Sequence, residues 1–162
     1  MEKFVILPKE EELEMIGTGF CKLANNMCFE KAVGALDGCH VKIARVPEDQ
    51  KSSYFSGHKG YYSSNFQALV GHEGTFIDVF VGYPGSVHDT RILRNSPLFK
   101  HQMYLPSGYY ILGDGRYPLL RKPIGIITPF KGNVVTPFEG RFNTGTILVQ
   151  HALAACLATS PV

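Results

Sequence analysis

The chain has 162 residues, of which 44% are apolar and 19% charged, and its formal net charge is +2. These values are typical of an ordinary globular protein, and the length suits one domain that buries roughly 68–70% of its unfolded surface. No apolar run approaches the ~20 residues that a membrane-spanning helix needs, so we expect no membrane partner. The four cysteines form neither a CxxC pair nor a zinc-type cluster. We therefore expect free thiols in a reducing compartment, the cytosol or the nucleus.

The charge is distributed unevenly. Residues 1–14 hold five acids and two bases, which leaves a net charge of +5 for residues 15–162. The acidic start is typical of neither a secretory signal nor a transit peptide. A domain with this balance permits a polyanionic partner without requiring one.

The first elements are a helix and a strand. Residues 9–25 carry apolar side chains at helical spacing, although Gly17 and Gly19 weaken the middle of that helix. Residues 34–46 are typical of a strand, and residues 47–60 form a polar loop rich in turn residues.

A hairpin follows. Residues 61–70 and 75–82 are typical of strands, and the connection GHEG between them is flanked by glycine. Asp78 interrupts the second strand, and we expect it to be structural. The apolar face of that strand is expected to consist of Ile77, Val79 and Val81.

The second half of the chain alternates helices and strands. After a Pro-Gly turn, Ser86 is a candidate N-cap for a helix that extends to residue 100. Residues 109–112 are wholly apolar, which indicates a central strand buried on both faces. A short strand at 124–127 and a loop at 131–141 precede a closing helix, which we expect to begin at Gly145.

This order of elements predicts an α/β fold, a mixed sheet flanked by helices. The first three strands would be antiparallel, and the last two would join through right-handed crossovers. If the first and fourth strands are neighbours, Asp37 and Asp114 lie side by side. A ribonuclease H-like fold uses that arrangement.

Three acids end or interrupt these elements in a similar way: Asp37, Asp89 and Asp114. A buried carboxylate requires a partner, and a divalent metal is one such partner. Each acid also has a structural explanation as a helix cap or turn residue. Asp89 in particular is favoured near a helix N-terminus by the helix dipole.

Four motifs occur in order along the chain: GALDGCHV, GYPGSVHDTRILRNSPLF, ILGDGRYPLL and ITPF, with a weaker continuation at GRFN and VQHAL. Together they resemble the nuclease domain of Harbinger-type transposases and the host proteins derived from them. The resemblance implies a ribonuclease H-like domain with a D-D-E active site. It also implies a divalent cation, Mg²⁺ or Mn²⁺, and DNA as the substrate. By motif, Asp37 and Asp114 match the catalytic acids, and Asp37, Asp89 and Asp114 match the metal ligands.

The chemistry is consistent with these residue types. Two metal ions about 3.5–4 Å apart can activate the attacking water and stabilise the leaving oxygen of a phosphodiester. Mg²⁺ takes hard oxygen ligands, commonly one or two carboxylates with waters and substrate phosphate.

The chain departs from the family pattern at its last acid. The matching position is Gln150, 36 residues after Asp114. Glutamine keeps an oxygen that can contact a metal but lacks the negative charge and cannot act as a base. We therefore expect Gln150 to be a degenerate fourth ligand, with weaker binding of the second metal and impaired cleavage.

The expected organisation is a helical lead-in at residues 1–33 and a DDE-type nuclease domain at residues 34–162. The basic segment that follows the last helix in the family is replaced by AACLATSPV, so we expect the domain to be truncated at its C-terminus. A separate DNA-binding protein would then supply target recognition. We expect a nuclear location, with the cytoplasm as an alternative.

Three basic residues are candidate phosphate contacts, each with solvated surface charge as the alternative: Lys59, Arg91 and Arg116. A second functional class also remains open. The chain could be a catalytically inactive, domesticated scaffold or binding protein that retains the fold. A third alternative is the absence of any stable function, if the closing helix leaves the core open on one side.

Overall fold

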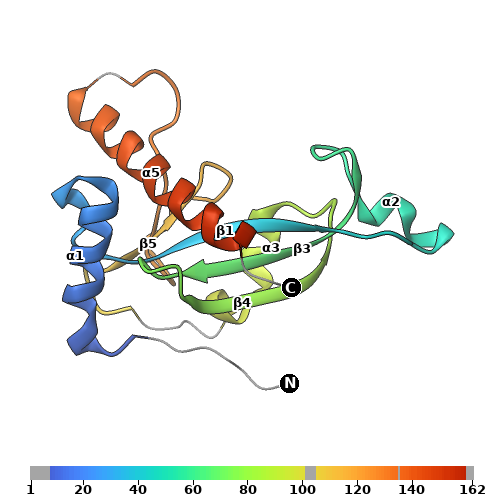
Figure 1. The fold of residues 1–162 in the computed structure, drawn as a ribbon, viewed down its shortest axis with the longest axis horizontal. Coiled ribbons are helices and arrows are strands. Elements are labelled where there is room, and N and C mark those ends of the chain that lie inside the picture. The colour runs from blue at the N-terminus through green and yellow to red at the C-terminus, as the bar shows by residue number, and fades with distance from the viewer. Residues whose placement is uncertain (1–7, 101–104, 135, 160–162) are drawn as a thin grey trace.

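The computed structural model describes residues 8–100, 105–134 and 136–159, and it shows one mixed sheet (Figure 1). The strand order is β4-β3-β1-β5-β6, and a two-residue strand, β2, pairs with the start of β3. Strands β4, β3 and β1 are antiparallel, whereas β1, β5 and β6 are parallel. The predicted α/β sheet of the ribonuclease H-like type is thereby confirmed. The strands are β1 (Ala32–Lys42), β2 (Phe55–Ser56), β3 (Tyr61–Val70), β4 (Phe76–Pro84), β5 (Tyr110–Gly113) and β6 (Ile126–Ile127).

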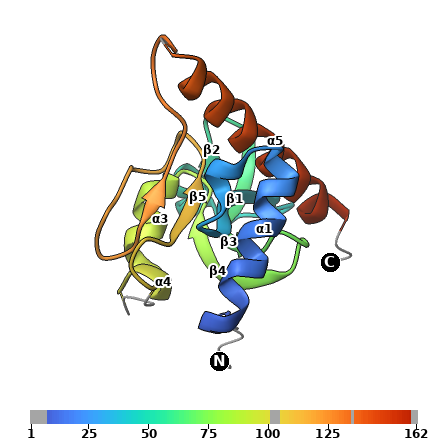
Figure 2. The same cartoon turned by 90° about the vertical axis from the view of Figure 1, so that its left-hand side faces the viewer.

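Helices cover both faces of the sheet, as Figure 2 shows. One face carries α1 (Leu13–Ala24) and α5 (Pro137–Thr159), and the other carries α3 (Asp89–Asn95) and α4 (Pro97–Lys100). Within the described residues, no helix is both long and apolar enough to cross a membrane. The remaining short helices are η1 (Glu10–Glu12), η2 (Met27–Phe29), η3 (Glu48–Gln50) and α2 (Lys51–Tyr54).

Strand β1 separates two hydrophobic cores. Ala35 belongs to the core under α1 and α5, together with Phe20 and Val149. Leu36, the next residue, belongs to the core under α3 and α4, together with Leu93. Both faces of the strand are therefore buried, and this explains why its first half reads as an unbroken apolar run.

Helix α5 begins eight residues earlier than expected, at Pro137 instead of Gly145. The reason is a capping box. The Thr136 Oγ1 accepts a hydrogen bond from the Glu139 amide (3.2 Å), and the Glu139 Oε2 accepts one from the Thr136 amide (2.9 Å). Proline is well suited to the first helical position, where its missing N–H removes no bond. The sequence TPFE carried this signal.

The predicted helix at 88–100 is two helices that meet at Ser96. Pro97 disfavours helical backbone in the residue before it, and Ser96 is extended, with ψ 152°. The N-cap is His88 and not Ser86, so Asp89 is the first residue of α3.

The predicted apolar face of β4 is wrong. Leu69 pairs with Asp78 and Val70 with Phe76, so the ladder leaves Ile77 as a bulge. A one-residue shift exchanges the two faces of a strand. Asp78 is consequently buried, whereas Val79 is 45% exposed and lies on the α1–α5 side with its partner Ala68.

This burial gives a stability prediction. Burial raises the pKa of Asp78, and a hydrogen bond from the Val79 amide lowers it in part. Because the folded pKa exceeds the ordinary 3.8, the ionised carboxylate opposes folding once the pH rises above that value. Asp78→Asn should therefore be more stable than the wild type at pH 7, by a margin that shrinks as the pH falls to 3.8. Urea unfolding at both pH values measures this, and a less stable variant at pH 7 would contradict it.

Candidate active site

The middle of β1 and the end of β5 bring two of the predicted acids together. Leu36 pairs with Gly113 in the parallel ladder, and Asp37 and Asp114 are the residues that follow them. The expectation that the first and fourth long strands are neighbours is confirmed. The acids lie at the carboxyl end of β5, where open α/β sheets place their sites.

Asp89 approaches from the other face of the sheet. By alternation, Asp37 shares the face of Ala35, which packs under α5, and Gly38 shares the face of Leu36. The Asp89 carboxylate lies directly over Gly38, since a Cβ on that glycine would be 2.5 Å from Asp89 Oδ1. Residue 38 is therefore a glycine because a carboxylate occupies the space of its side chain.

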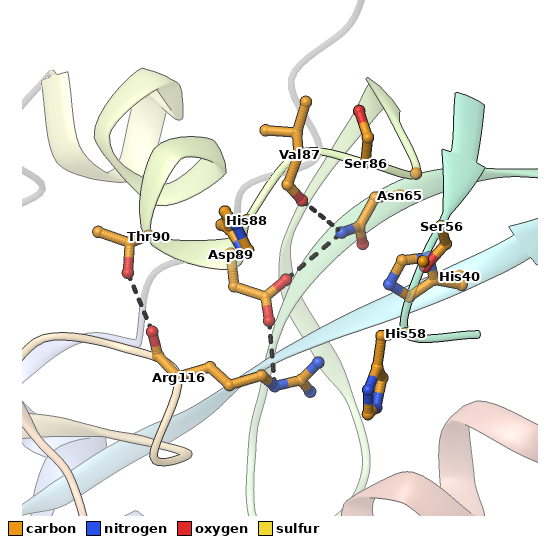
Figure 3. A pocket seen from close by; sticks show the side chains of 12 residues that line it. His40, Ser56, His58, Asn65, Ser86, Val87, His88, Asp89, Thr90 and Arg116 are labelled. Carbon is orange, nitrogen blue, oxygen red and sulfur yellow. Dashed lines mark hydrogen bonds and ion pairs between the residues drawn. The ribbon is translucent and has the colours of Figure 1, made fainter. Parts of the chain in front are cut away.

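All three carboxylates converge on one guanidinium. The Arg116 Nε lies 2.7 Å from Asp114 Oδ2 and 3.2 Å from Asp89 Oδ2, and an Arg116 terminal nitrogen lies 3.6 Å from Asp37 Oδ1. Figure 3 shows Asp89 and Arg116 facing each other across the site. The structure thus brings the three predicted acids to one point. The positive charge at that point is the guanidinium of Arg116.

The electrostatics of the site disfavour three ionised carboxylates without a compensating cation. Burial raises the pKa of Asp37, and the neighbouring carboxylates of Asp114 and Asp89 raise it further. A hydrogen bond from the Gly38 amide (2.8 Å) and the Arg116 charge oppose that rise. A cation at this point is therefore favourable in physical terms.

The site also holds unsatisfied polar atoms. Four buried side-chain atoms lack a hydrogen-bond partner within residues 8–100, 105–134 and 136–159: Asn65 Oδ1, Gln67 Oε1, Tyr117 OH and Gln150 Nε2. Asn65 donates to Asp89 Oδ1 (3.4 Å), and Gln67 pairs in the sheet with Gly38, beneath that carboxylate. Polar atoms of this kind can bind water or an ion.

The residues fit a divalent cation in their chemistry. Three carboxylate oxygens and nearby amide oxygens are hard donors of the kind that Mg²⁺ and Mn²⁺ prefer. The Arg116 guanidinium contacts all three of these carboxylates. In the described part of the chain, no three His, Cys, Asp or Glu side chains are arranged to hold one ion.

Gln150 lies on α5, next to Val149, which packs in the same core as Ala35. Residue 150 therefore belongs to the helix that covers the Asp37 face of the sheet, where a fourth ligand is expected. Its side chain is half-buried, with the Nε2 unpaired. Rotation of this amide about its last side-chain bond would present the acceptor oxygen instead.

A cavity of about 570 Å³ opens beside Asp89 and Arg116. Its wall includes His40, His58 and His88 (Figure 3). The His40 Nδ1 lies 2.9 Å from the Ser63 hydroxyl, and burial lowers the pKa of that histidine. The imidazole N–H groups and the Arg116 guanidinium are hydrogen-bond donors that would suit a polyanion.

Of the predicted phosphate contacts, Arg116 is engaged with the acids, and Lys59 and Arg91 are exposed and do not line the cavity. Lys59 lies close enough to contribute to the lowered pKa of His40. The roles assigned to the site residues stay predictions.

Sequence reasoning missed His40, Asn65, Gln67 and Tyr117. Strand alternation in YYSSNFQALV places Asn65 and Gln67 on one face of a buried strand. Two polar side chains on a buried face indicate a polar site beside that strand. Tyr117 is buried, and its pKa is raised by burial and by the carboxylates of Asp89 and Asp37. Only the tertiary structure brings that phenol near the acids.

The contact at Gly38 gives a prediction. Gly38→Ala should displace the Asp89 carboxylate and destabilise the protein by about 1–3 kcal/mol, because the new methyl group overlaps Asp89 Oδ1. Gly57→Ala is the control, since nothing lies within 4 Å of a Cβ at that residue. Thermal unfolding compares the two, and an equal effect of both substitutions would contradict the contact.

Comparisons with known proteins agree with this geometry. Residues 36–155 match the family model described as DDE superfamily endonuclease. The chain belongs to this family. It is 30% identical to "Protein ALP1-like" of Arabidopsis thaliana over 88% of this chain and 38% of that protein. It is 30% identical to "Putative nuclease HARBI1" of Rattus norvegicus over 78% of this chain and 35% of that protein.

The resemblance to Harbinger-derived nucleases is thereby confirmed. The chain is a DDE endonuclease domain, and it spans little more than a third of the length of these two relatives. No solved structure matches it. DDE endonucleases typically use divalent metals and act on nucleic acid.

Proposed function

We propose that this DDE domain is a divalent-metal-dependent DNA endonuclease whose turnover is impaired at residue 150. The observation that carries the proposal is the convergence of Asp37, Asp89 and Asp114 on one cationic group. Three carboxylates at one partly buried point repel one another unless a cation compensates them.

Asp37 and Asp114 would be the principal ligands of Mg²⁺ or Mn²⁺, because they adjoin where β5 ends beside the middle of β1. Asp89, 4% exposed and held by Asn65, would orient its carboxylate toward the same cation from the opposite face. When bound, the metal would supply Lewis-acid activation of water and of the scissile phosphate. The three-histidine wall of the adjoining cavity would receive the DNA backbone.

Gln150 is the weak member of this set. Its amide provides a neutral oxygen or nitrogen where a carboxylate would add a charged ligand and a proton acceptor. The buried and unpaired Nε2 supports the view that residue 150 faces a position meant for another group.

A catalytically inactive binding protein is the alternative, and one observation favours it. The Arg116 guanidinium already compensates the acids without any metal. In that case the fold and the cavity beside Arg116 would bind DNA or a protein partner without cleaving it.

DNA as substrate, a separate DNA-binding protein for target recognition, and a nuclear location, with the cytoplasm as alternative, are parts of the same proposal. They are supported by the family, whose members act on nucleic acid.

Nicking of supercoiled plasmid tests the proposal. The wild-type chain and Gln150→Glu are incubated with Mn²⁺ or with a chelator, and Asp114→Asn is introduced into each. Metal-dependent nicking that disappears with Asp114→Asn supports the nuclease. Binding of DNA without nicking by either parent protein would overturn it in favour of the inactive alternative.

A further inference from the structure

Arg116 occupies the position between the acids that a metal ion would need. We propose that Arg116 is a built-in competitor of the metal, whose guanidinium must leave the carboxylates before a divalent cation can bind. This inference rests on the proposed function, since it concerns the same acids. By this proposal, Arg116 determines how high the metal concentration must be before the site binds a metal ion.

The distances show that competition is unavoidable. One side chain lies 2.7 Å from Asp114, 3.2 Å from Asp89 and 3.6 Å from Asp37, so it contacts every acid of the predicted set. A cation held by two of these carboxylates would need the same oxygens that the guanidinium now contacts. Two cations at one point would also repel each other.

The side chain can leave without disturbing the turn that carries it. The Arg116 amide donates to Asp114 Oδ1 (2.9 Å), and the Arg116 carbonyl accepts from the Thr90 hydroxyl (2.9 Å). Both bonds involve the backbone of residue 116, so they are independent of where the guanidinium points. The side chain is 47% exposed and borders the 570 Å³ cavity, which has room to receive it.

The alternative is that the ion pairs are permanent and that no metal enters. The two cases differ in what happens when the guanidinium is removed. A competitor lowers metal affinity, so its removal strengthens metal binding. A permanent structural cation is needed for folding: the wild type then binds no Mn²⁺, and removal of the guanidinium leaves three mutually repelling carboxylates, whose repulsion Mn²⁺ does not relieve.

Titration of Mn²⁺ into the full chain, without DNA, distinguishes these cases. Arg116→Gln should bind Mn²⁺ about 10-fold more tightly than the wild type, because an ion pair that opposes binding is gone. Arg116→Lys keeps the charge and should stay near the wild-type affinity. Arg121→Gln removes the same charge from an exposed residue outside the cluster and serves as the matched control.

Thermal unfolding provides a second readout that needs no activity. Without metal, Arg116→Gln should melt below the wild type, because the carboxylates repel one another. Saturating Mn²⁺ should raise its Tm by more than it raises that of the wild type, since stabilisation grows with affinity.

The outcomes separate this inference from the function on which it rests. If the wild type binds Mn²⁺ and Arg116→Gln binds it equally or more weakly, the proposal that Arg116 competes with the metal is overturned. The nuclease proposal then still stands. Absence of Mn²⁺ binding in the wild type and in a folded Arg116→Gln would overturn both. If Arg116→Gln is unfolded without metal, recovery of its cooperative melting in Mn²⁺ supports the competitor, and failure to recover contradicts it.

Discussion

Gln150→Glu will raise the rate of metal-dependent DNA nicking by about 100-fold. The substitution adds a negative ligand on α5, the helix that covers the Asp37 face of the sheet. One well-placed electrostatic group is typically worth a factor of 10²–10³ in rate. The measurement is the initial rate of plasmid nicking at fixed Mn²⁺ concentration.

Gln50→Glu is the matched control, because it introduces the same charge at an exposed residue of η3. Its rate should equal that of the wild type. If Gln150→Glu also remains at the wild-type rate while the protein is folded and binds Mn²⁺, residue 150 is not the missing ligand.

Gly17→Ala will destabilise the domain by about 2–3 kcal/mol, although helix propensity alone predicts a gain of about 0.8–1.0 kcal/mol. A Cβ at residue 17 would lie 1.8 Å from the Glu30 carbonyl oxygen and 2.6 Å from its carbon. Both are backbone atoms, so α1 would have to move away from the chain that leads into β1. Denaturant unfolding at neutral pH measures the change.

Gly140→Ala tests the same substitution on α5, where the nearest atom to a new Cβ is Val134 Cγ1, at an ordinary 3.6 Å. That variant should be more stable than the wild type by the full difference in helix propensity between glycine and alanine, about 0.8–1.0 kcal/mol. If Gly17→Ala also stabilises the protein, the close contact between α1 and the backbone of Glu30 is contradicted.

The sheet could be predicted because its signals are local. An apolar run in β1, a Gly-flanked hairpin between β3 and β4, and a second apolar run in β5 each appear within ten or so residues. Together with the order of elements, they placed Asp37 beside Asp114. The early start of α5 is also encoded locally, in the capping box of Thr136 and Glu139.

The remaining features depend on distant contacts. The bulge at Ile77 arises from how β4 pairs with β3, which no periodicity in β4 alone reveals. Gly17 weakens a helix by its propensity, and only the backbone of Glu30, which lies against it, explains why a glycine is needed there. Arg116 was expected to contact phosphate, and only the tertiary structure shows that its guanidinium lies among the three acids.

The central claim is that these acids form a divalent-metal site, and titration calorimetry with Mn²⁺ on the wild type and Asp37→Asn tests it most directly. Asp37 is the ligand that β1 fixes beside Asp114, and asparagine keeps its size while removing its charge. We predict saturable binding by the wild type and a loss of at least about 10-fold in affinity for the variant. A folded wild type that binds no Mn²⁺, or an Asp37→Asn that binds it equally well, would contradict the claim.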